Sequence, residues 1–359
     1  MTKYYSVITG HGSYIPNRII KNDQFIDQLF LESDGSQVKR NNQEIIDKFE
    51  EITTISERRY CEPEVGASDM AYEAALKAIA SSGIDPEKLD HLIMAHNFGD
   101  VRGPHRQTDI VPSLASRVKT KLGIKNPNCV AYDIIFGCPG WLQGVIQGDY
   151  YIKSGDAKAI LVIGAENLSL VSDPHDRDSM IYADGAGAFI IEQRESSEPI
   201  GIIAHASRTD AVGYSALLTM DNSYEEVQNR EGSLYLKMNG RRLYQYALEH
   251  VPVAMKACLD KSGIALKDIK RILIHQANGK MDDAILERFY SIQGESEIPK
   301  DIMPMTISWL GNSSVATLPT LYDLMQSGKI DTAPVVSGDY IMFASVGAGM
   351  SINAVVYKV

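Results

Sequence analysis

The sequence predicts an α/β protein built from two similar halves, and two observations carry this prediction. First, short apolar segments of strand length alternate with amphipathic segments of helical periodicity, which is the pattern of layered α/β folds. Second, the same series of segments occurs twice along the chain. The 359 residues are enough for such a duplicated core. We expect the two halves to span residues 1–194 and 195–359.

The expected elements of the first half follow one another in order. Strands are expected at residues 4–9, 91–96, 128–136, 158–164 and 185–192, and helices at 22–31, 43–52, 69–81, 111–122 and 138–153. Residues 32–42 are polar and are expected to form a loop or an insertion. Ser68 is a residue type that caps helix N-termini, and Pro112 and Pro139 suit the first helical turn.

The second half repeats this order. Helices are expected at 241–261, 280–289 and 315–326, and strands at 271–275, 339–345 and 351–357. Ser-Gly-Ile at 82–84 precedes an expected strand, and Ser-Gly-Ile occurs again before a strand at 262–264. Likewise, Gly-Cys at 137–138 and Gly-Asn at 311–312 each precede an expected helix. Two matches in the same order indicate a duplicated unit, with its halves related by a pseudo-twofold axis.

Composition and charge exclude several classes of protein. The net charge of −11 argues against a general nucleic-acid binder. No apolar run is long enough to cross a bilayer, and the N-terminal segment has the pattern of a strand rather than of a signal peptide, so we expect a cytoplasmic protein without a membrane partner. The four cysteines, at 61, 129, 138 and 258, form no CxxC pair. His91, His96, His105 and His175 show no metal-ligand spacing, so we expect no metal.

Cys138 is the candidate nucleophile. Gly137 permits a tight strand-to-helix turn, and Pro139 suits the start of the helix, so the thiol is expected beside the helix N-cap. Free backbone N–H groups and the positive end of the helix dipole there favour the thiolate, which is the reactive form. On this stretch alone, a buried structural cysteine is an equal alternative. The repeat places Asn312 at the equivalent position of the second half, and His275 ends a neighbouring strand, so all three are expected to meet.

At these residues the chain resembles the thiolase superfamily, specifically β-ketoacyl-acyl carrier protein synthase III, over essentially its whole length. The motifs are FGCPGW around Cys138, HQAN from His275, GNSSVAT around Asn312, DGAGA at Asp184–Ala188 and Gly-Ala-Gly at 347–349. The resemblance implies a duplicated five-layer α/β/α/β/α fold. It also implies that Cys138, His275 and Asn312 form a catalytic triad.

This resemblance implies an acyltransferase that needs no cofactor and uses acyl-CoA or acyl-carrier-protein thioesters together with malonyl-acyl carrier protein. Cys138 would take the acyl group, and the backbone N–H groups of Cys138 and Ala348 would hold the oxyanion. Loss of CO2 from the malonyl group would give an enolate whose oxygen is bound by His275 and Asn312. A Claisen condensation in fatty-acid or related lipid biosynthesis would follow.

The resemblance also implies binding residues and partners. Acyl carrier protein is the expected partner, and the residues expected to contact the carrier or the acyl group are Arg177, Lys280, Val111, Trp141, Gly347 and Gly349. Val111 aligns with an aromatic residue that the second subunit contributes in the family, so a homodimer with more room for the acyl group is expected. At the positions of an adenine-stacking tryptophan and a usual arginine, the chain has Lys48 and Ile52. We therefore expect a primer longer than acetyl and less dependence on coenzyme A.

Two other functions stay open at this point. A related acyltransferase of secondary metabolism would condense the acyl chain with another acceptor, forming a ring or an ester. A papain-like thiol hydrolase also has Cys, His and Asn in this order. However, Pro-Gly-Trp follows the cysteine here, and Asn312 lies far beyond His275.

Overall fold

Two β-sheets form the centre of the protein, for which a computed structural model describes residues 3–103, 107–226 and 232–359. The first sheet has the strand order β1-β7-β6-β4-β5 and the second β11-β12-β13-β8. The strands of the first sheet are β1 (Lys3–Tyr14), β4 (His91–His96), β5 (Val130–Ile135), β6 (Ala159–Asn167) and β7 (Asp184–Ser196). Those of the second are β8 (Gly201–Thr209), β11 (Ile269–Ile274), β12 (Tyr340–Gly347) and β13 (Ser351–Lys358).

The pairing of the strands confirms the predicted duplication. In the first sheet β4 and β6 are parallel, while β6–β7 and β7–β1 are antiparallel. In the second sheet β11 and β12 are parallel, while β12–β13 and β13–β8 are antiparallel. The first sheet has one further strand, β5, beside β4. At the equivalent place beside β11, Ile272 N donates to Ile302 O at 2.8 Å, but no strand is formed there among the described residues.

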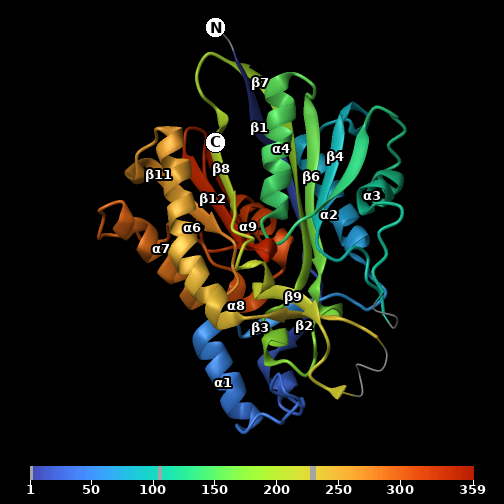
Figure 1. Ribbon diagram of the computed structural model, residues 1–359. Helices are drawn as coiled ribbons and strands as arrows, with labels where there is room; N and C mark the ends of the chain where they lie inside the picture. The colour runs from blue at the N-terminus through green and yellow to red at the C-terminus, as the bar shows by residue number, and fades with distance from the viewer. Residues whose placement is uncertain (1–2, 104–106, 227–231) are drawn as a thin grey trace.

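Helices cover both sheets and fill the space between them, which gives the five-layer fold (Figure 1). Helices α2 (Ala67–Ser82) and α3 (Leu114–Leu122) pack on the outer face of the first sheet. Helices α6 (Gly240–Ser262) and α7 (Gly279–Ile292) form the outer layer on the second sheet. Helices α4 (Gly140–Ser154) and α9 (Thr317–Gln326) lie between the sheets.

The central helix α4 can approach the first sheet closely because it presents glycine there. A Cβ added to Gly144 would lie 2.8 Å from a methyl group of Val162, and one added to Gly148 would lie 2.5 Å from the end of Ile191. Trp141 packs between the two sheets, with its ring edge-on to Phe189 of β7 at 4.6 Å and to Phe343 of β12 at 6.0 Å between centroids. This packing fixes the position of the α4 N-terminus between the two sheets. Cys138 lies next to that N-terminus.

Smaller elements gather at one end of the two sheets (Figure 1). They are β2 (Arg18–Lys21), α1 (Asn42–Thr53), β3 (Glu57–Tyr60), β9 (Leu218–Asp221), β10 (Tyr235–Met238) and α8 (Ile307–Leu310). The fully buried Arg58 ties this end together, because its guanidinium donates to Met180 O, Ile20 O and Asn22 Oδ1. We call these elements and residues 22–41 the end cap; they wall the cavity described below.

Most predicted elements are present, and the differences have local causes. The helix expected at 22–31 is only a 3-10 turn at Asn22–Phe25, because the Asn42 side chain binds the carbonyl oxygens of Ile26 and Gln28 that a helix would use. The short strands β2, β3, β9 and β10 and the longer β8 were not predicted.

Four predicted helix starts are also wrong by two or three residues, and one of them is α9, which starts at Thr317 rather than at residue 315. Helix α2 starts at Ala67, and Ser68 does not cap it, because its hydroxyl donates to Asp100. Helix α3 starts at Leu114, after the cap Ser113. Helix α4 starts at Gly140, with Pro139 as its N-cap rather than its first residue.

Candidate active site

A cavity of about 1040 Å³ opens between the ends of the two sheets and the end cap. Cys138, His275 and Asn312 all line it, although they come from three separate segments of the chain. Cys138 follows β5, His275 follows β11, and Asn312 follows α8. The structure therefore brings these three residues to one cavity, as the sequence predicts.

The Cys138 turn is packed directly against the turn between β12 and β13. A Cβ added to Gly137 would lie 2.5 Å from Ala348 N, and one added to Gly347 would lie 2.5 Å from Cys138 N. Such close backbone contact is open only to glycine at both positions. Cys138, Gly347 and Ala348 all line the cavity, so the two backbone N–H groups expected to hold an oxyanion belong to neighbouring turns of its wall.

The thiol of Cys138 is not activated in the way that its position beside a helix N-terminus predicts. Burial raises its pKa to about 11, and the carboxylate of Glu166 adds to the rise. Against this, Ser314 Oγ donates a hydrogen bond to Cys138 Sγ at 3.4 Å, which lowers the pKa. Desolvation outweighs the hydrogen bond, so Cys138 is protonated at neutral pH. Ser314 was missed at the sequence level, although it lies only two residues after Asn312.

His275 is a neutral ring with both nitrogens free. It is buried at the end of β11, where its backbone N–H binds Ala344 O at 2.9 Å, and neither ring nitrogen has a hydrogen-bond partner among the described residues. Burial lowers its pKa to about 4. The next residue, Gln276, ties the segment after β11 to the start of α8, because its Oε1 accepts hydrogen bonds from the backbone N–H groups of Thr306 and Ile307.

Asn312 is held by hydrogen bonds of its backbone and of its side-chain carbonyl oxygen. Its N–H donates to Ile181 O at 2.9 Å, and its carbonyl accepts from Ala183 N at 2.8 Å. Its Oδ1 accepts from Ser314 N at 2.8 Å. None of the described residues accepts from Nδ2, which leaves this N–H group for a ligand. The site therefore offers an amide donor and a neutral imidazole beside a thiol.

The other predicted binding residues are placed unevenly. Arg177 and Gly347 line the cavity, and Arg177 Nη1 lies 3.5 Å from Glu32 Oε1. Lys280, Val111, Trp141 and Gly349 do not line it. Lys280 is exposed and 3.5 Å from Glu51, and the Val111 side chain is 83% exposed.

Trp141 is only 1% exposed, in the core between the sheets, so the structure assigns it to packing rather than to substrate contact. Lys48 and Ile52, which the resemblance was expected to place at an adenine-stacking tryptophan and an arginine of the family, both line the cavity.

Other kinds of site are not found in the described part of the chain. No group of three or more potential ligands there can hold a metal ion, and the four cysteines are free thiols. His105 lies outside the described residues. No helix within the described ranges is long and apolar enough to cross a membrane.

A duplicated five-layer α/β fold with Cys, His and Asn around one cavity defines a thiolase-like acyltransferase. Residues 132–211 match the family model of 3-oxoacyl-[acyl-carrier-protein] synthase III, and residues 259–359 match the model of its C-terminal part. The chain belongs to the β-ketoacyl-[acyl-carrier-protein] synthase III family and is an acyltransferase of this kind. The papain-like alternative is therefore wrong.

Three proteins illustrate the relationship. The β-ketoacyl-[acyl-carrier-protein] synthase III of Staphylococcus aureus (strain Newman) is 31% identical over 353 residues, which are 98% of this chain and 98% of that one. The synthase III 1 of Halalkalibacterium halodurans is 29% identical over 345 residues, which are 96% and 95% of the two chains. The crystal structure of 3-oxoacyl-[acyl-carrier-protein] synthase III from Aquifex aeolicus VF5 matches with a TM-score of 0.78 and 28% identity, over 99% and 100% of the two chains.

Proposed function

We propose that this chain catalyses a decarboxylative Claisen condensation between an acyl group carried on Cys138 and malonyl-acyl carrier protein. The observation that carries the proposal is the common wall of Cys138, His275 and Asn312 in one cavity. The free imidazole nitrogens and the free Nδ2 of Asn312 support it, because they are uncharged hydrogen-bonding groups with no partner among the described residues.

The first half-reaction is the transfer of an acyl group to the enzyme. Cys138 Sγ attacks the carbonyl carbon of the primer thioester, its bond to that carbon forms, and the bond from the carbon to the carrier sulfur breaks. The proton lost by Cys138 ends on the departing carrier thiol. The backbone N–H groups of Cys138 and Ala348 hold the oxyanion of the intermediate, and the packing of their two turns supports this role.

The second half-reaction makes the carbon–carbon bond. The malonyl group loses CO2, and the electron pair left behind forms an enolate whose carbon attacks the acyl carbon on Cys138. His275 Nε2 and Asn312 Nδ2 hold the enolate oxygen. Since decarboxylation itself supplies the carbon nucleophile, no strong base is needed, and a buried imidazole with a pKa of about 4 fits this task. The bond between the acyl carbon and Cys138 Sγ then breaks, and the sulfur takes up a proton from water.

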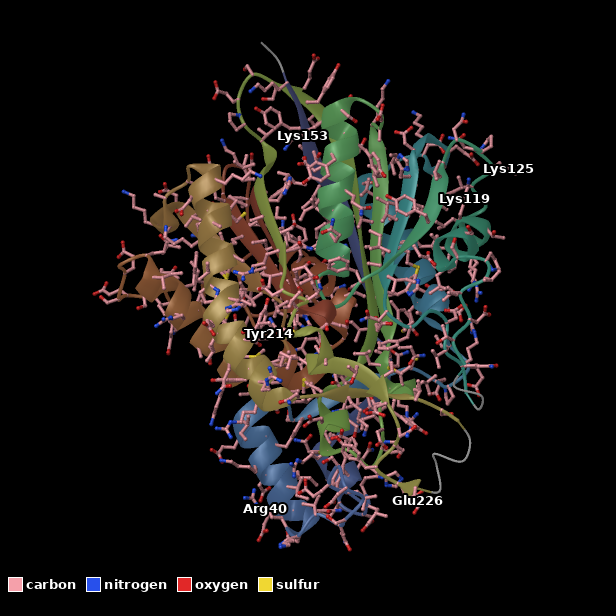
Figure 2. The ribbon with its side chains drawn as sticks, viewed as in Figure 1. Arg40, Lys119, Lys125, Lys153, Tyr214 and Glu226 are labelled. Atoms are coloured by element: carbon pink, nitrogen blue, oxygen red, sulfur yellow. The ribbon has the colours of Figure 1, made fainter. Side chains whose placement is uncertain are left out.

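Charge at the rim of the cavity supports a phosphate-bearing carrier arm. Five exposed cationic side chains line the cavity, namely Lys39, Arg40, Lys48, Arg177 and Arg241. Arg40 lies beside α1 in the end cap (Figure 2). Exposed cations in the wall of a cavity attract the phosphate of a pantetheine arm. We assign these five residues to the carrier, rather than Lys280, which does not line the cavity.

The exposed face of β5 supports a homodimer. This strand is at the edge of the first sheet, Ile135 at its end is 66% exposed, and Val111 is exposed nearby in the chain that leads to α3. An edge strand with apolar side chains invites pairing with a second chain. Val111 then reaches the partner's acyl pocket. The functional unit is thus a cytoplasmic homodimer. Within each chain, the two similar halves divide near residue 194.

Intact-mass measurement tests the function directly. The protein is incubated with acetyl, octanoyl and dodecanoyl thioesters of coenzyme A and of carrier protein, and malonyl-carrier protein is then added. We expect one acyl group to be gained and then lost as a β-ketoacyl product. Cys138→Ala should gain none, whereas Cys258→Ala, which removes a fully buried thiol, should behave as wild type. Acylation that survives Cys138→Ala contradicts the proposal.

A further inference from the structure

Tyr182 is held beside Asn312 in the wall of the cavity. Residues 182 and 312 form an isolated parallel β-bridge, and Asn312 is bonded to the backbone on both sides of Tyr182, at Ile181 and Ala183. Side chains of paired residues in such a bridge extend to the same face. Both residues line the cavity. The phenol ring is thus fixed next to the group assigned to the enolate.

The hydroxyl of Tyr182 has no hydrogen-bond partner among the described residues, although the residue is only 4% exposed. A buried hydroxyl without a partner is costly, so such groups are normally satisfied by protein, water or ligand. Its pKa is raised well above the ordinary value by burial, and further by Asp178, Asp176 and Cys138. Tyr182 is therefore a permanent neutral donor within electrostatic range of the nucleophile. His275 is in the same state, buried, lining the cavity and unpartnered.

A second polar group lies four residues before Tyr182. Asp178 lines the same cavity, and none of the described residues donates a side-chain or backbone hydrogen bond to its carboxyl group. Burial, followed by the charge of Asp176, raises its pKa to about 7. The cavity wall also contains apolar residues, among them Leu168, Met180, Leu236 and Met238. The buried Tyr182 hydroxyl without a partner, together with the half-exposed carboxyl group of Asp178 in the same wall, indicates a ligand that carries a matching polar group.

We propose that Tyr182 and Asp178 select acyl chains that carry a hydroxyl group close to the thioester. This inference rests on the proposed function and names the substrate class of the same cavity. A hydroxyl oxygen accepts from the phenol, and a hydroxyl hydrogen can be donated to the carboxyl group. A hydrocarbon chain leaves both groups unmatched. An ammonium group would have to pass the cationic rim, and a second carboxylate would meet Asp178, so a neutral hydroxyl fits best.

The test compares two thioesters of equal chain length, octanoyl-CoA and 3-hydroxyoctanoyl-CoA. The rate of acyl-enzyme formation with each is followed by intact mass, and the ratio of the two rates is the readout. In wild type we expect the hydroxylated chain to react about tenfold faster, as the loss or gain of one buried hydrogen bond predicts. Tyr182→Phe keeps the ring and should abolish this preference, and Asp178→Asn should weaken it.

Tyr214→Phe is the matched control, because it removes a phenol oxygen outside the cavity, where the ring packs on Tyr246 and His250 close to α6 (Figure 2). It should leave the ratio at the wild-type value. Since the readout is a ratio within each variant, partial misfolding does not imitate the effect. A wild type acylated equally fast by both chains, or a Tyr182→Phe variant that keeps the preference, overturns this inference alone. A wild type acylated by neither overturns the proposed function with it.

Discussion

The hydroxyl of Ser314 donates a hydrogen bond to the sulfur of Cys138 across 176 positions of sequence, at 3.4 Å. Ser314 is held in place by its own N–H, which binds Asn312 Oδ1 at 2.8 Å. The second half of the molecule thus acts on the nucleophile of the first. Because a hydrogen bond to sulfur favours the charged form, Ser314 partly offsets the desolvation of Cys138.

Ser314→Ala should slow the acylation of Cys138. Without the hydrogen bond the thiol pKa rises further, so the thiolate fraction falls at every pH below that pKa. One neutral hydrogen bond contributes ~1 kcal/mol, which corresponds to about a fivefold loss of rate. The measurement is the rate of acyl-enzyme formation at pH 7 and at pH 9, and an unchanged rate at both would contradict the role. Ser313→Ala is the control, since the Ser313 hydroxyl contacts Thr317 instead.

The pH dependence of Cys138 alkylation should show no plateau in the neutral range. With a pKa near 11, the thiolate fraction increases about tenfold with each pH unit up to roughly pH 10. Iodoacetamide labelling of the Cys138 peptide, followed by mass spectrometry between pH 6 and pH 10, measures this. A rate that levels off below pH 8 would show that the thiol is activated in the resting enzyme.

His275→Ala and Asn312→Ala should each form the acyl-enzyme but fail to condense it. Each removes one donor to the enolate oxygen, and loss of such a donor lowers the rate by on the order of 10²-fold or more. Single-turnover experiments separate the two half-reactions, with the acyl-enzyme followed by mass and the β-ketoacyl product by chromatography. Equal losses in both half-reactions would contradict the assigned roles.

The native particle should have twice the mass of the chain in light scattering at micromolar concentration. Ile135→Asp puts a charge on the exposed end of β5 and should shift the particle toward monomer. Val212→Asp is the control, since Val212 is 96% exposed in a loop away from that edge. A wild type that scatters as a monomer, or an Ile135→Asp variant that stays dimeric, would rule out pairing through β5.

Octanoyl thioesters should be better primers than acetyl-CoA by kcat/KM. The resemblance implies that Lys48 takes the place of an adenine-stacking tryptophan, and the loss of such a stack would cost about 1–3 kcal/mol. Each methylene buried in the cavity contributes ~0.8 kcal/mol, so four of them outweigh that loss. Octanoyl-carrier protein, which has no adenine, should be at least as good as octanoyl-CoA. A clear preference for acetyl-CoA would contradict this prediction and leave the triad untouched.

The duplicated fold and the meeting of Cys138, His275 and Asn312 in one cavity were predictable because they depend on patterns that the chain repeats. The Gly-Cys and Gly-Asn turns are visible in the sequence, and so is the strand that ends at His275. Tertiary contacts explain the predictions that were wrong. The 22–31 helix is replaced where Asn42 takes its carbonyl groups, and Trp141 is taken into the core by Phe189.

The state of the thiol and its neighbours also lay beyond the sequence. Proximity to a helix N-terminus is visible in the sequence, whereas the desolvation that outweighs it depends on everything packed around Cys138. Tyr182 gave no signal, because nothing in its sequence context says that its hydroxyl is left without a partner.

The contact between Gly137 and the Gly347-Ala348 turn has a consequence for the folding of the chain during its synthesis. The turn that carries Cys138 is synthesised early, yet it packs against the turn between β12 and β13, which follows about 210 positions later in the sequence. Until that hairpin is in place, the wall behind Cys138 is absent, and so is the Ala348 N–H group. A nascent chain that has not yet reached residue 348 therefore carries the cysteine without this wall and without the second backbone N–H group expected to hold the oxyanion.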